Sequence, residues 1–92
     1  MATAYRNLSE YNKEFIPDGA DYKIGIVVSE WNENITLNLL KGAKEALIEN
    51  GVQENNIIVR FVPGAFELPL GSQYMLENTD VDGVIAIGVV IQ

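Results

Sequence analysis

Short apolar runs and longer amphipathic segments alternate along this chain. "KIGIVV" (Lys23–Val28) is an unbroken, largely β-branched run, which predicts a strand buried on both faces, as in a parallel sheet. "IIVRFV" (Ile57–Val62) predicts a second strand, and "GVIAIGVVI" (Gly83–Ile91) predicts a third strand that is also buried. Helical segments separate these runs, so strands and helices are expected to alternate.

The segment after the first run, "ENITLNLLKGAKEALIEN" (Glu33–Asn50), predicts a long helix. Its apolar stripe repeats every four residues and is widened by two neighbours: Ile35, Leu39, Ala43 and Leu47, with Leu40 and Ala46. We expect Asn32 to be the N-cap and Glu33 to lie favourably in the first turn. Gly51 is expected to take the left-handed position after the helix. A second helix is predicted over roughly Glu67–Glu77.

The order strand, helix, strand, helix, strand predicts an α/β fold with a parallel sheet. If the first strand lies between the other two, the helices cover opposite faces and give a flavodoxin-like three-layer sandwich. Ligands of such sheets bind at the carboxyl ends of the strands. Here those ends are Ser29–Asn32, Pro63–Glu67 and Val89–Gln92, which predicts that three distant stretches form one site.

Met1–Asp21 is polar with scattered aromatic residues, and we interpret it as an N-terminal arm before one α/β domain, Tyr22–Gln92. Two alternatives stay open: the arm is disordered, or its aromatic side chains dock on a neighbouring subunit. The N-terminus has no apolar segment of the signal-peptide type. The longest apolar run, Val84–Ile91, is interrupted by glycine and too short to span a bilayer. A cytoplasmic location is expected.

Composition narrows the function classes. The net charge of −7 without a basic cluster argues against nucleic acid or an anionic membrane as a partner. The absence of cysteine and histidine excludes disulfides, thiolate chemistry and a Ser-His-Asp arrangement within these residues. No metal-ligand cluster and no phosphate-binding glycine motif is present. The sequence therefore predicts a ligand-binding edge without evident catalytic residues, cofactor or metal.

Each candidate at that edge has a functional and a structural interpretation. Trp31 could be a platform for a flat heterocycle or an ordinary packing residue. Glu67, after Phe66, could accept hydrogen bonds from ligand hydroxyls or merely favour the helix dipole. The backbone of Val89–Ile91 could pair with the polar edge of a ligand or simply end a strand. Gly64 lets the backbone approach a ligand closely, which also fits a simple turn.

Three motifs in this order carry a resemblance: "SEWNENITLNLLKGAKEAL", "VPGAFELP" and "AIGVVIQ". From about Tyr22 to Gln92 the chain closely resembles the 6,7-dimethyl-8-ribityllumazine synthases of riboflavin biosynthesis. The resemblance implies a four-stranded parallel sheet and homo-oligomers, either pentamers or an icosahedral shell of sixty subunits. It implies condensation of 5-amino-6-(D-ribitylamino)uracil with 3,4-dihydroxy-2-butanone 4-phosphate, with loss of phosphate and water and without a cofactor or metal.

The resemblance also assigns roles to the candidate residues. Trp31 matches the aromatic residue that stacks on the pyrimidine ring. Ala65, Phe66 and Glu67 match the segment that holds the ribityl chain and the ring, with Glu67 accepting from ribityl hydroxyls. Val89, Val90 and Ile91 match the strand end whose backbone contacts the uracil edge. These assignments favour the functional interpretation of each residue.

The resemblance further implies segments that follow the position of Gln92. In the family these are a phosphate-binding loop, a proton-transferring histidine, a basic residue and an aromatic residue that reaches the neighbouring site. We therefore expect a domain that is incomplete at its C-terminus, no catalytic residue among these 92, and no activity from them alone. The last strand would be an exposed apolar edge that a fourth strand covers.

Two alternatives to the enzyme remain. One is a non-catalytic ligand-binding or shell-assembly subunit of the same fold. The other is an unrelated flavodoxin-like binding domain, which the three motifs in register disfavour.

Overall fold

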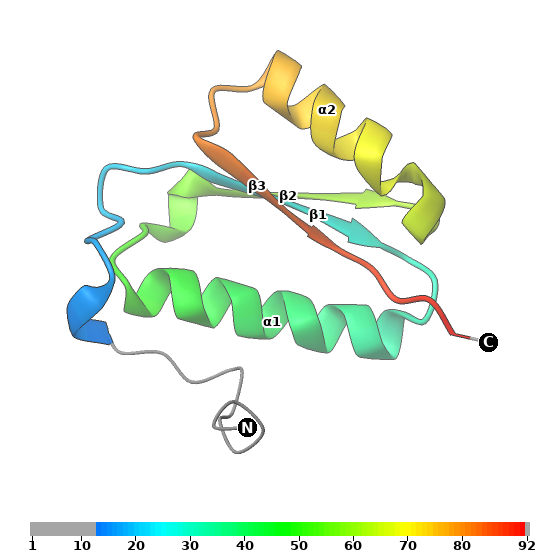
Figure 1. Cartoon of the computed structure of the whole chain (residues 1–92), viewed down its shortest axis with the longest axis horizontal. Helices are drawn as coiled ribbons and strands as arrows, with labels where there is room; N and C mark the ends of the chain where they lie inside the picture. Colours follow the sequence, from blue (N-terminus) through cyan, green and yellow to red (C-terminus); the bar gives the residue numbers. More distant parts are fainter. Residues whose placement is uncertain (1–12, 92) are drawn as a thin grey trace, which may run out of the picture.

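The computed structural model describes residues 13–91, and a parallel sheet with the strand order β2–β1–β3 lies at its centre (Figure 1). The strands are β1 (Ile24–Ser29), β2 (Ile57–Val62) and β3 (Gly83–Ile87). The first strand is in the middle, as the alternation of elements allowed. Every residue of β1 from Gly25 to Ser29 is buried, which confirms a strand enclosed on both faces.

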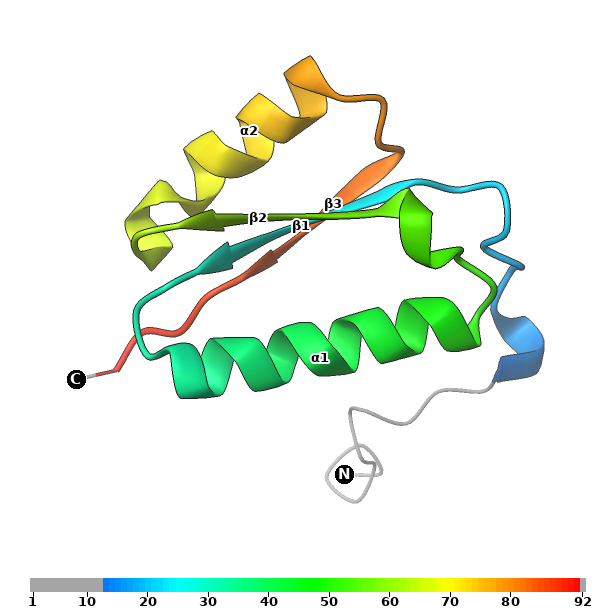
Figure 2. The same ribbon diagram turned by 180° about the vertical axis from the view of Figure 1, so that it is seen from behind.

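The two α-helices cover opposite faces of this sheet. Helix α1 (Glu33–Glu49) lies below it in Figure 1, and α2 (Leu68–Asn78) lies above it; Figure 2 shows the same layers from behind. Short 3-10 turns occur at Lys13–Phe15, Glu54–Asn56 and Ala65–Glu67. The three-layer, flavodoxin-like arrangement of β-α-β-α-β elements is confirmed. Over residues 13–91 no helix has the length and apolar character needed to cross a membrane.

The core lies mainly between the sheet and α1. Ile26 and Val28 of β1 and Ile87 of β3 form its buried centre. Leu40, Ala43, Leu47, Ile57, Val59 and Ile85 pack around that centre. On the other face Met75 of α2 is the large buried side chain. Gly25 of β1 accommodates it, because glycine has no side chain at the place that the Met75 sulfur occupies.

The predicted apolar stripe of α1 was partly wrong. Ile35 and Leu39 are 37% and 49% exposed, whereas Thr36 is fully buried. The line that faces the sheet is therefore Thr36, Leu40, Ala43 and Leu47. One residue turns a helix by about 100°, so choosing Ile35 and Leu39 placed the N-terminal half of the stripe on the wrong side. Hydrophobic character alone could not reveal that threonine takes a buried position.

The two ends of α1 differed in how well the sequence predicted them. Asn32 is the N-cap residue, but its backbone is left-handed (φ 57°) and its side chain makes no capping bond. Its carbonyl instead accepts from Ile35 N and Thr36 N. At the other end Gly51 has φ 101°, as predicted. Two bonds, Val52 N to Leu47 O (3.0 Å) and Gly51 N to Ile48 O (3.1 Å), form a Schellman motif there.

Strand β3 is shorter than predicted, because it ends at Ile87 and Val89–Ile91 are not strand. Its last partner is Val28, while Ser29 of β1 pairs with Val62 of β2. Beyond Ser29 the chain follows β2, since Glu30 N donates to Val62 O at 2.8 Å. The residues after β3 thus lose the neighbour that would extend the ladder. Within β3 only Ile87 is buried, so the prediction of a strand buried throughout was also wrong for the described residues.

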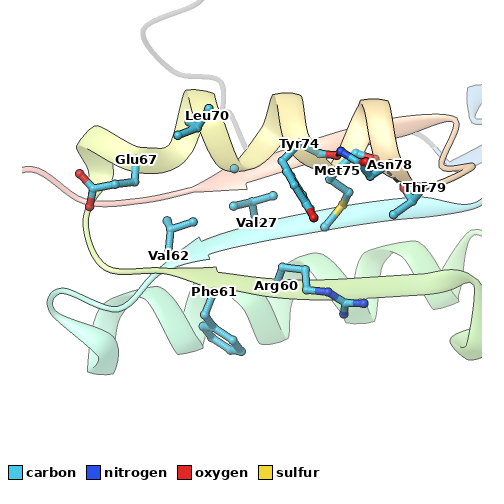
Figure 3. A pocket seen from close by; sticks show the side chains of 11 residues that line it. Val27, Arg60, Phe61, Val62, Glu67, Leu70, Tyr74, Met75, Asn78 and Thr79 are labelled. Atoms are coloured by element: carbon cyan, nitrogen blue, oxygen red, sulfur yellow. Dashed lines mark hydrogen bonds between the residues drawn. The ribbon is translucent and has the colours of Figure 1, made fainter.

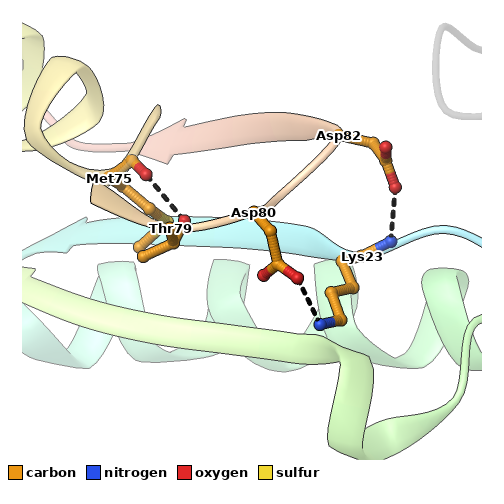
Figure 4. Close-up of polar contacts among 5 residues, drawn as sticks. All are labelled: Lys23, Met75, Thr79, Asp80 and Asp82. Atoms are coloured by element: carbon orange, nitrogen blue, oxygen red, sulfur yellow. Dashed lines mark hydrogen bonds and ion pairs between the residues drawn. The ribbon is translucent and has the colours of Figure 1, made fainter. Parts of the chain in front are cut away.

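The opposite edge of the sheet is joined by polar contacts (Figure 4). Lys23 N donates to Asp82 Oδ2 at 2.8 Å, and Asp82 N donates to Lys23 O at 2.7 Å. Lys23 Nζ forms an ion pair with Asp80 at 2.6 Å. This hydrogen bond from Lys23 is the main reason that the pKa of Asp80 lies below its ordinary value. The N-terminal ends of β1 and β3 are therefore held together.

A residue that precedes the sheet contacts the end of α1. Gly19 is buried, and its N–H donates to Asn50 O at 2.8 Å, beside the end of α1. The interpretation of Met1–Asp21 as an arm falls largely on residues 1–12, which lie outside the described residues.

Candidate functional site

The three strands end at one edge of the sheet. Ile24 of β1 pairs with both Ile57 and Gly83, so the strands start level with one another. Being parallel, they also deliver the loops that follow Ser29, Val62 and Ile87 to the same edge. The structure therefore brings the predicted stretches to one side of the molecule.

The loops after β1 and β2 are hydrogen-bonded to each other. Glu30 N donates to Val62 O at 2.8 Å, and Trp31 N donates to Pro63 O at 3.1 Å. The indole of Trp31 reaches the second loop as well, since a Cβ on Gly64 would lie 3.2 Å from its Cδ1. Trp31 is nevertheless 70% exposed, so it is not a core residue of the described chain. Its ring is held at the edge of the site with much of its surface open to solvent.

The turn after β2 is held by Glu67. Its carboxylate Oε1 accepts from Gly64 N at 2.8 Å, and Glu67 N donates to Gly64 O at 3.2 Å. Both bonds close the 3-10 turn Ala65–Glu67 that leads into α2. The second carboxylate oxygen, Oε2, has no hydrogen-bond partner among residues 13–91. Glu67 thus has a structural role through Oε1, which closes the turn, while its expected role in ligand binding stays a prediction.

The remaining candidates differ in exposure. Phe66 is 96% exposed and Val90 is 87% exposed, although both are large and apolar. Ala65 and Val89 are half-buried, and Ile91 is 58% exposed. Phe66, Val90 and Trp31 are thus three exposed apolar side chains in the loops at this edge, and each is unfavourable to leave in water.

An open hollow at this edge has a volume of about 590 Å³. It is lined by Glu30, Trp31, Asn32, Glu33 and Pro63. An aromatic face beside carboxylates suits a flat, uncharged ligand that carries hydroxyl or N–H donors. An anion would be repelled by the carboxylates of Glu30, Glu33 and Glu67.

A second hollow, of about 560 Å³, lies between β2 and α2 (Figure 3). Glu67 is at one end of it, while Tyr74 and Arg60 line its middle. The sequence reasoning did not predict this hollow. Its signal was the apolar pair Leu70 and Tyr74, which are 70% and 68% exposed on a helix whose other face is packed. Within the described part of the chain, no three acidic residues approach closely enough to hold a metal ion.

The end of β3 joins the turn at Gly88. A Cβ placed on Gly88 would lie 3.5 Å from Ala65 Cβ and 3.4 Å from Ser29 Oγ. Val89–Ile91 therefore begin directly beside the turn, although they are not part of the sheet. The sequence placed Ser29 in one of the three predicted stretches but did not predict its contact with Gly88; the only signal is the small size of both residues at the ends of two neighbouring strands.

Comparison with known proteins is consistent with this geometry. A family model described as 6,7-dimethyl-8-ribityllumazine synthase matches residues 21–92. Proteins of that name from Porphyromonas gingivalis, Parabacteroides distasonis and Christiangramia forsetii are 56%, 50% and 52% identical to the chain over its whole length. The chain covers 57%, 58% and 55% of these relatives, so it spans little more than half of their length. It belongs to the 6,7-dimethyl-8-ribityllumazine synthase family.

Proposed function

We propose that the protein containing this chain is a lumazine synthase of riboflavin biosynthesis. It would condense 5-amino-6-(D-ribitylamino)uracil with 3,4-dihydroxy-2-butanone 4-phosphate and form 6,7-dimethyl-8-ribityllumazine. The observation that carries the proposal is the contact between Trp31 and the turn that starts at Gly64. An exposed aromatic face beside a turn that is closed by a carboxylate suits a hydroxylated heterocycle.

Each candidate residue has a role in this proposal. Trp31 stacks on the pyrimidine ring, as its exposed indole allows. Glu67 accepts hydrogen bonds from ribityl hydroxyls through Oε2, while Oε1 keeps the turn closed. Ala65 and Phe66 flank the ring and the ribityl chain. The backbone of Val89, Val90 and Ile91 pairs with the uracil edge.

The charges at this edge favour one of the two substrates. Glu30, Glu33 and Glu67 give it a negative potential, which disfavours the phosphate of the second substrate. The uracil carries no such anionic group. We therefore assign the described edge to the uracil and its ribityl chain.

Catalysis in this proposal depends mostly on holding two substrates in the right orientation, followed by proton transfer.

We also propose a cytoplasmic homo-oligomer, a pentamer or an icosahedral shell, in which the site lies between adjacent subunits. The exposed Phe66 and Val90 support an oligomer, because burial against a neighbour would remove both from water.

The test uses the complete gene product that carries this chain. Both substrates are mixed with the purified protein, and lumazine formation is followed by its fluorescence. We expect turnover well above the reaction without protein. Substrate binding without turnover would instead favour the non-catalytic subunit of the same fold. Native mass spectrometry of the same sample measures the number of subunits.

A further inference from the structure

A contact at the edge of the site joins its three chain segments. A Cβ placed on Gly88 would stand 2.6 Å from Leu68 Cδ1, 3.4 Å from Ser29 Oγ and 3.5 Å from Ala65 Cβ. Carbon atoms do not approach to 2.6 Å, so a larger residue at position 88 would displace its surroundings. Ser29 ends β1, Ala65 begins the turn after β2, and Gly88 follows β3. We call these three small residues the joint.

The joint contains a polar group without a partner. Ser29 is fully buried, and its hydroxyl has no hydrogen-bond partner in the described part of the chain. Leaving a buried hydroxyl unpaired is unfavourable, and buried polar groups in folded proteins are nearly always satisfied. A serine hydroxyl can both donate and accept. Its position at the carboxyl end of the central strand is where ligands of such sheets bind.

We propose that the joint is part of the ligand site. Gly88 and Ser29 set the separation between the turn Ala65–Glu67 and the segment Val89–Ile91. The hydroxyl of Ser29 gains a hydrogen-bond partner when a heterocycle with an amide-like edge binds over the joint. Gly88 is thus a positioning residue, and Ser29 is an additional binding residue. This inference rests on the proposed function, since it names a further part of the same site.

Two features of the structure make the separation between the turn and the segment Val89–Ile91 sensitive to substitution at Gly88. The turn is held from the side of β1 by the bond from Trp31 N to Pro63 O. Leu68, the first residue of α2, lies over Gly88 and belongs to the same rigid helix that packs on the sheet. An added methyl group at position 88 would meet the end of the Leu68 side chain first, so either that side chain or the segment after β3 must move to accommodate it. Either movement changes the packing of the joint beside the turn.

The first arm of the test replaces Gly88→Ala, with Gly83→Ala as the matched control. Gly83 begins β3, the strand that Gly88 follows, and a Cβ there would meet nothing within 4 Å. The dissociation constant for ribitylaminouracil is measured by calorimetry on the complete gene product, together with the melting temperature. We expect Gly88→Ala to weaken binding by about tenfold or more, because small misplacements are costly. Gly83→Ala should leave the affinity unchanged.

The second arm needs no larger side chain and so avoids a folding defect. Ser29→Ala removes only the hydroxyl, and Ser72→Ala is its control because Ser72 Oγ is also buried and unpartnered, but lies on α2. Ser29→Ala should keep or raise the melting temperature, since an unpaired polar group is lost. The same change should weaken ligand binding by about three- to tenfold. Ser72→Ala should not change the affinity.

Measurements on the unaltered protein distinguish a failure of this inference from a failure of the proposed function. If it binds ribitylaminouracil and the Gly88→Ala and Ser29→Ala variants bind equally well, the joint has only a structural role and this inference is overturned. If the unaltered protein does not bind the uracil at all, the proposed function fails, and the role of the joint fails with it.

Discussion

The indole of Trp31 lies against Gly64, a residue 33 positions later in the sequence. A Cβ on Gly64 would stand 3.2 Å from Trp31 Cδ1 and 3.8 Å from Nε1. The bond from Trp31 N to Pro63 O fixes the same two loops through their backbones. The aromatic ring is therefore positioned before a ligand arrives, which reduces the entropy lost on binding.

Replacing Trp31→Ala should weaken binding of ribitylaminouracil by about 1–3 kcal/mol, the usual value of stacking a base on an aromatic ring. Trp31→Phe should retain most of the affinity. Calorimetric titration measures both, and Tyr74→Ala is the control because Tyr74 is a similarly exposed aromatic residue on α2. Equal affinities for Trp31→Ala and the unaltered protein would refute the stacking role.

Gly64→Ala should disturb the same contact from the other side. The new methyl group would lie 3.2 Å from the indole and 3.4 Å from Glu67 Oε1, so the ring must shift by a few tenths of an ångström. We expect a changed emission spectrum of Trp31, the only tryptophan in these 92 residues, and a smaller loss of affinity than Trp31→Ala causes. An unchanged spectrum would show that the indole does not rest on Gly64 in solution.

The two roles of Glu67 can be separated by two substitutions. Glu67→Gln keeps an oxygen that can accept from Gly64 N, so the free energy of unfolding should fall by about 0.5 kcal/mol or less. Ligand affinity should fall by about 1 kcal/mol or more, because the charged acceptor is lost. Glu67→Ala should lose the closed turn as well and cost about 1 kcal/mol of stability. Chemical denaturation measures stability and calorimetry measures affinity; if Gln and Ala lower both equally, the carboxylate only closes the turn.

Gly42→Ala should stabilise the protein. Gly42 lies inside α1 and is exposed, and a Cβ there would meet nothing within 4 Å. Alanine is favoured over glycine at such a helix position by about 0.5–1 kcal/mol. Urea denaturation should show this gain, with no change in ligand affinity. A loss of stability would indicate that position 42 is covered by another part of the complete protein or by a neighbouring subunit.

The ion pair of Asp80 with Lys23 predicts a small dependence of stability on pH. Its pKa in the folded protein is below the ordinary value of 3.8, so the folded state holds fewer protons than the unfolded state near that pH. The stabilisation is present above pH 3.8 and is lost as the pH falls through the lowered pKa. Asp80→Asn should therefore melt at a slightly lower temperature near neutral pH, and the difference should vanish in acid. Because both groups are exposed, added salt should reduce the difference. If the difference in melting temperature persists in acid, the ion pair of Asp80 with Lys23 is not its cause.

The sequence was most informative where one residue type dictates the backbone. Gly51 closes α1 as predicted, because a left-handed position after a helix strongly favours glycine. The β-branched run of β1 likewise allowed few alternatives. These local signals, with the alternation of elements, were enough to predict the layers of the fold and the edge at which the candidate residues meet.

Prediction from the sequence was weaker where tertiary contacts determine which residues are buried and where a strand ends. The burial of Thr36 instead of Ile35 depends on how α1 is rotated against the sheet, which hydrophobicity alone does not determine. The end of β3 at Ile87 depends on β1 leaving that strand to follow β2. The joint of Ser29, Ala65 and Gly88 arises only when three strand ends converge. No pattern along the chain could reveal it.

The contacts of Lys23 with Asp80 and Asp82 lie at the edge of the sheet opposite Trp31. The six residues of β1 separate the two edges by about 20 Å. The two edges share no side chain, so a substitution that strengthens the contacts of Lys23 should leave the arrangement around Trp31 unchanged. An engineer could therefore raise the thermal tolerance of this protein at Lys23 and Asp82 and, independently, retune ligand preference at Trp31.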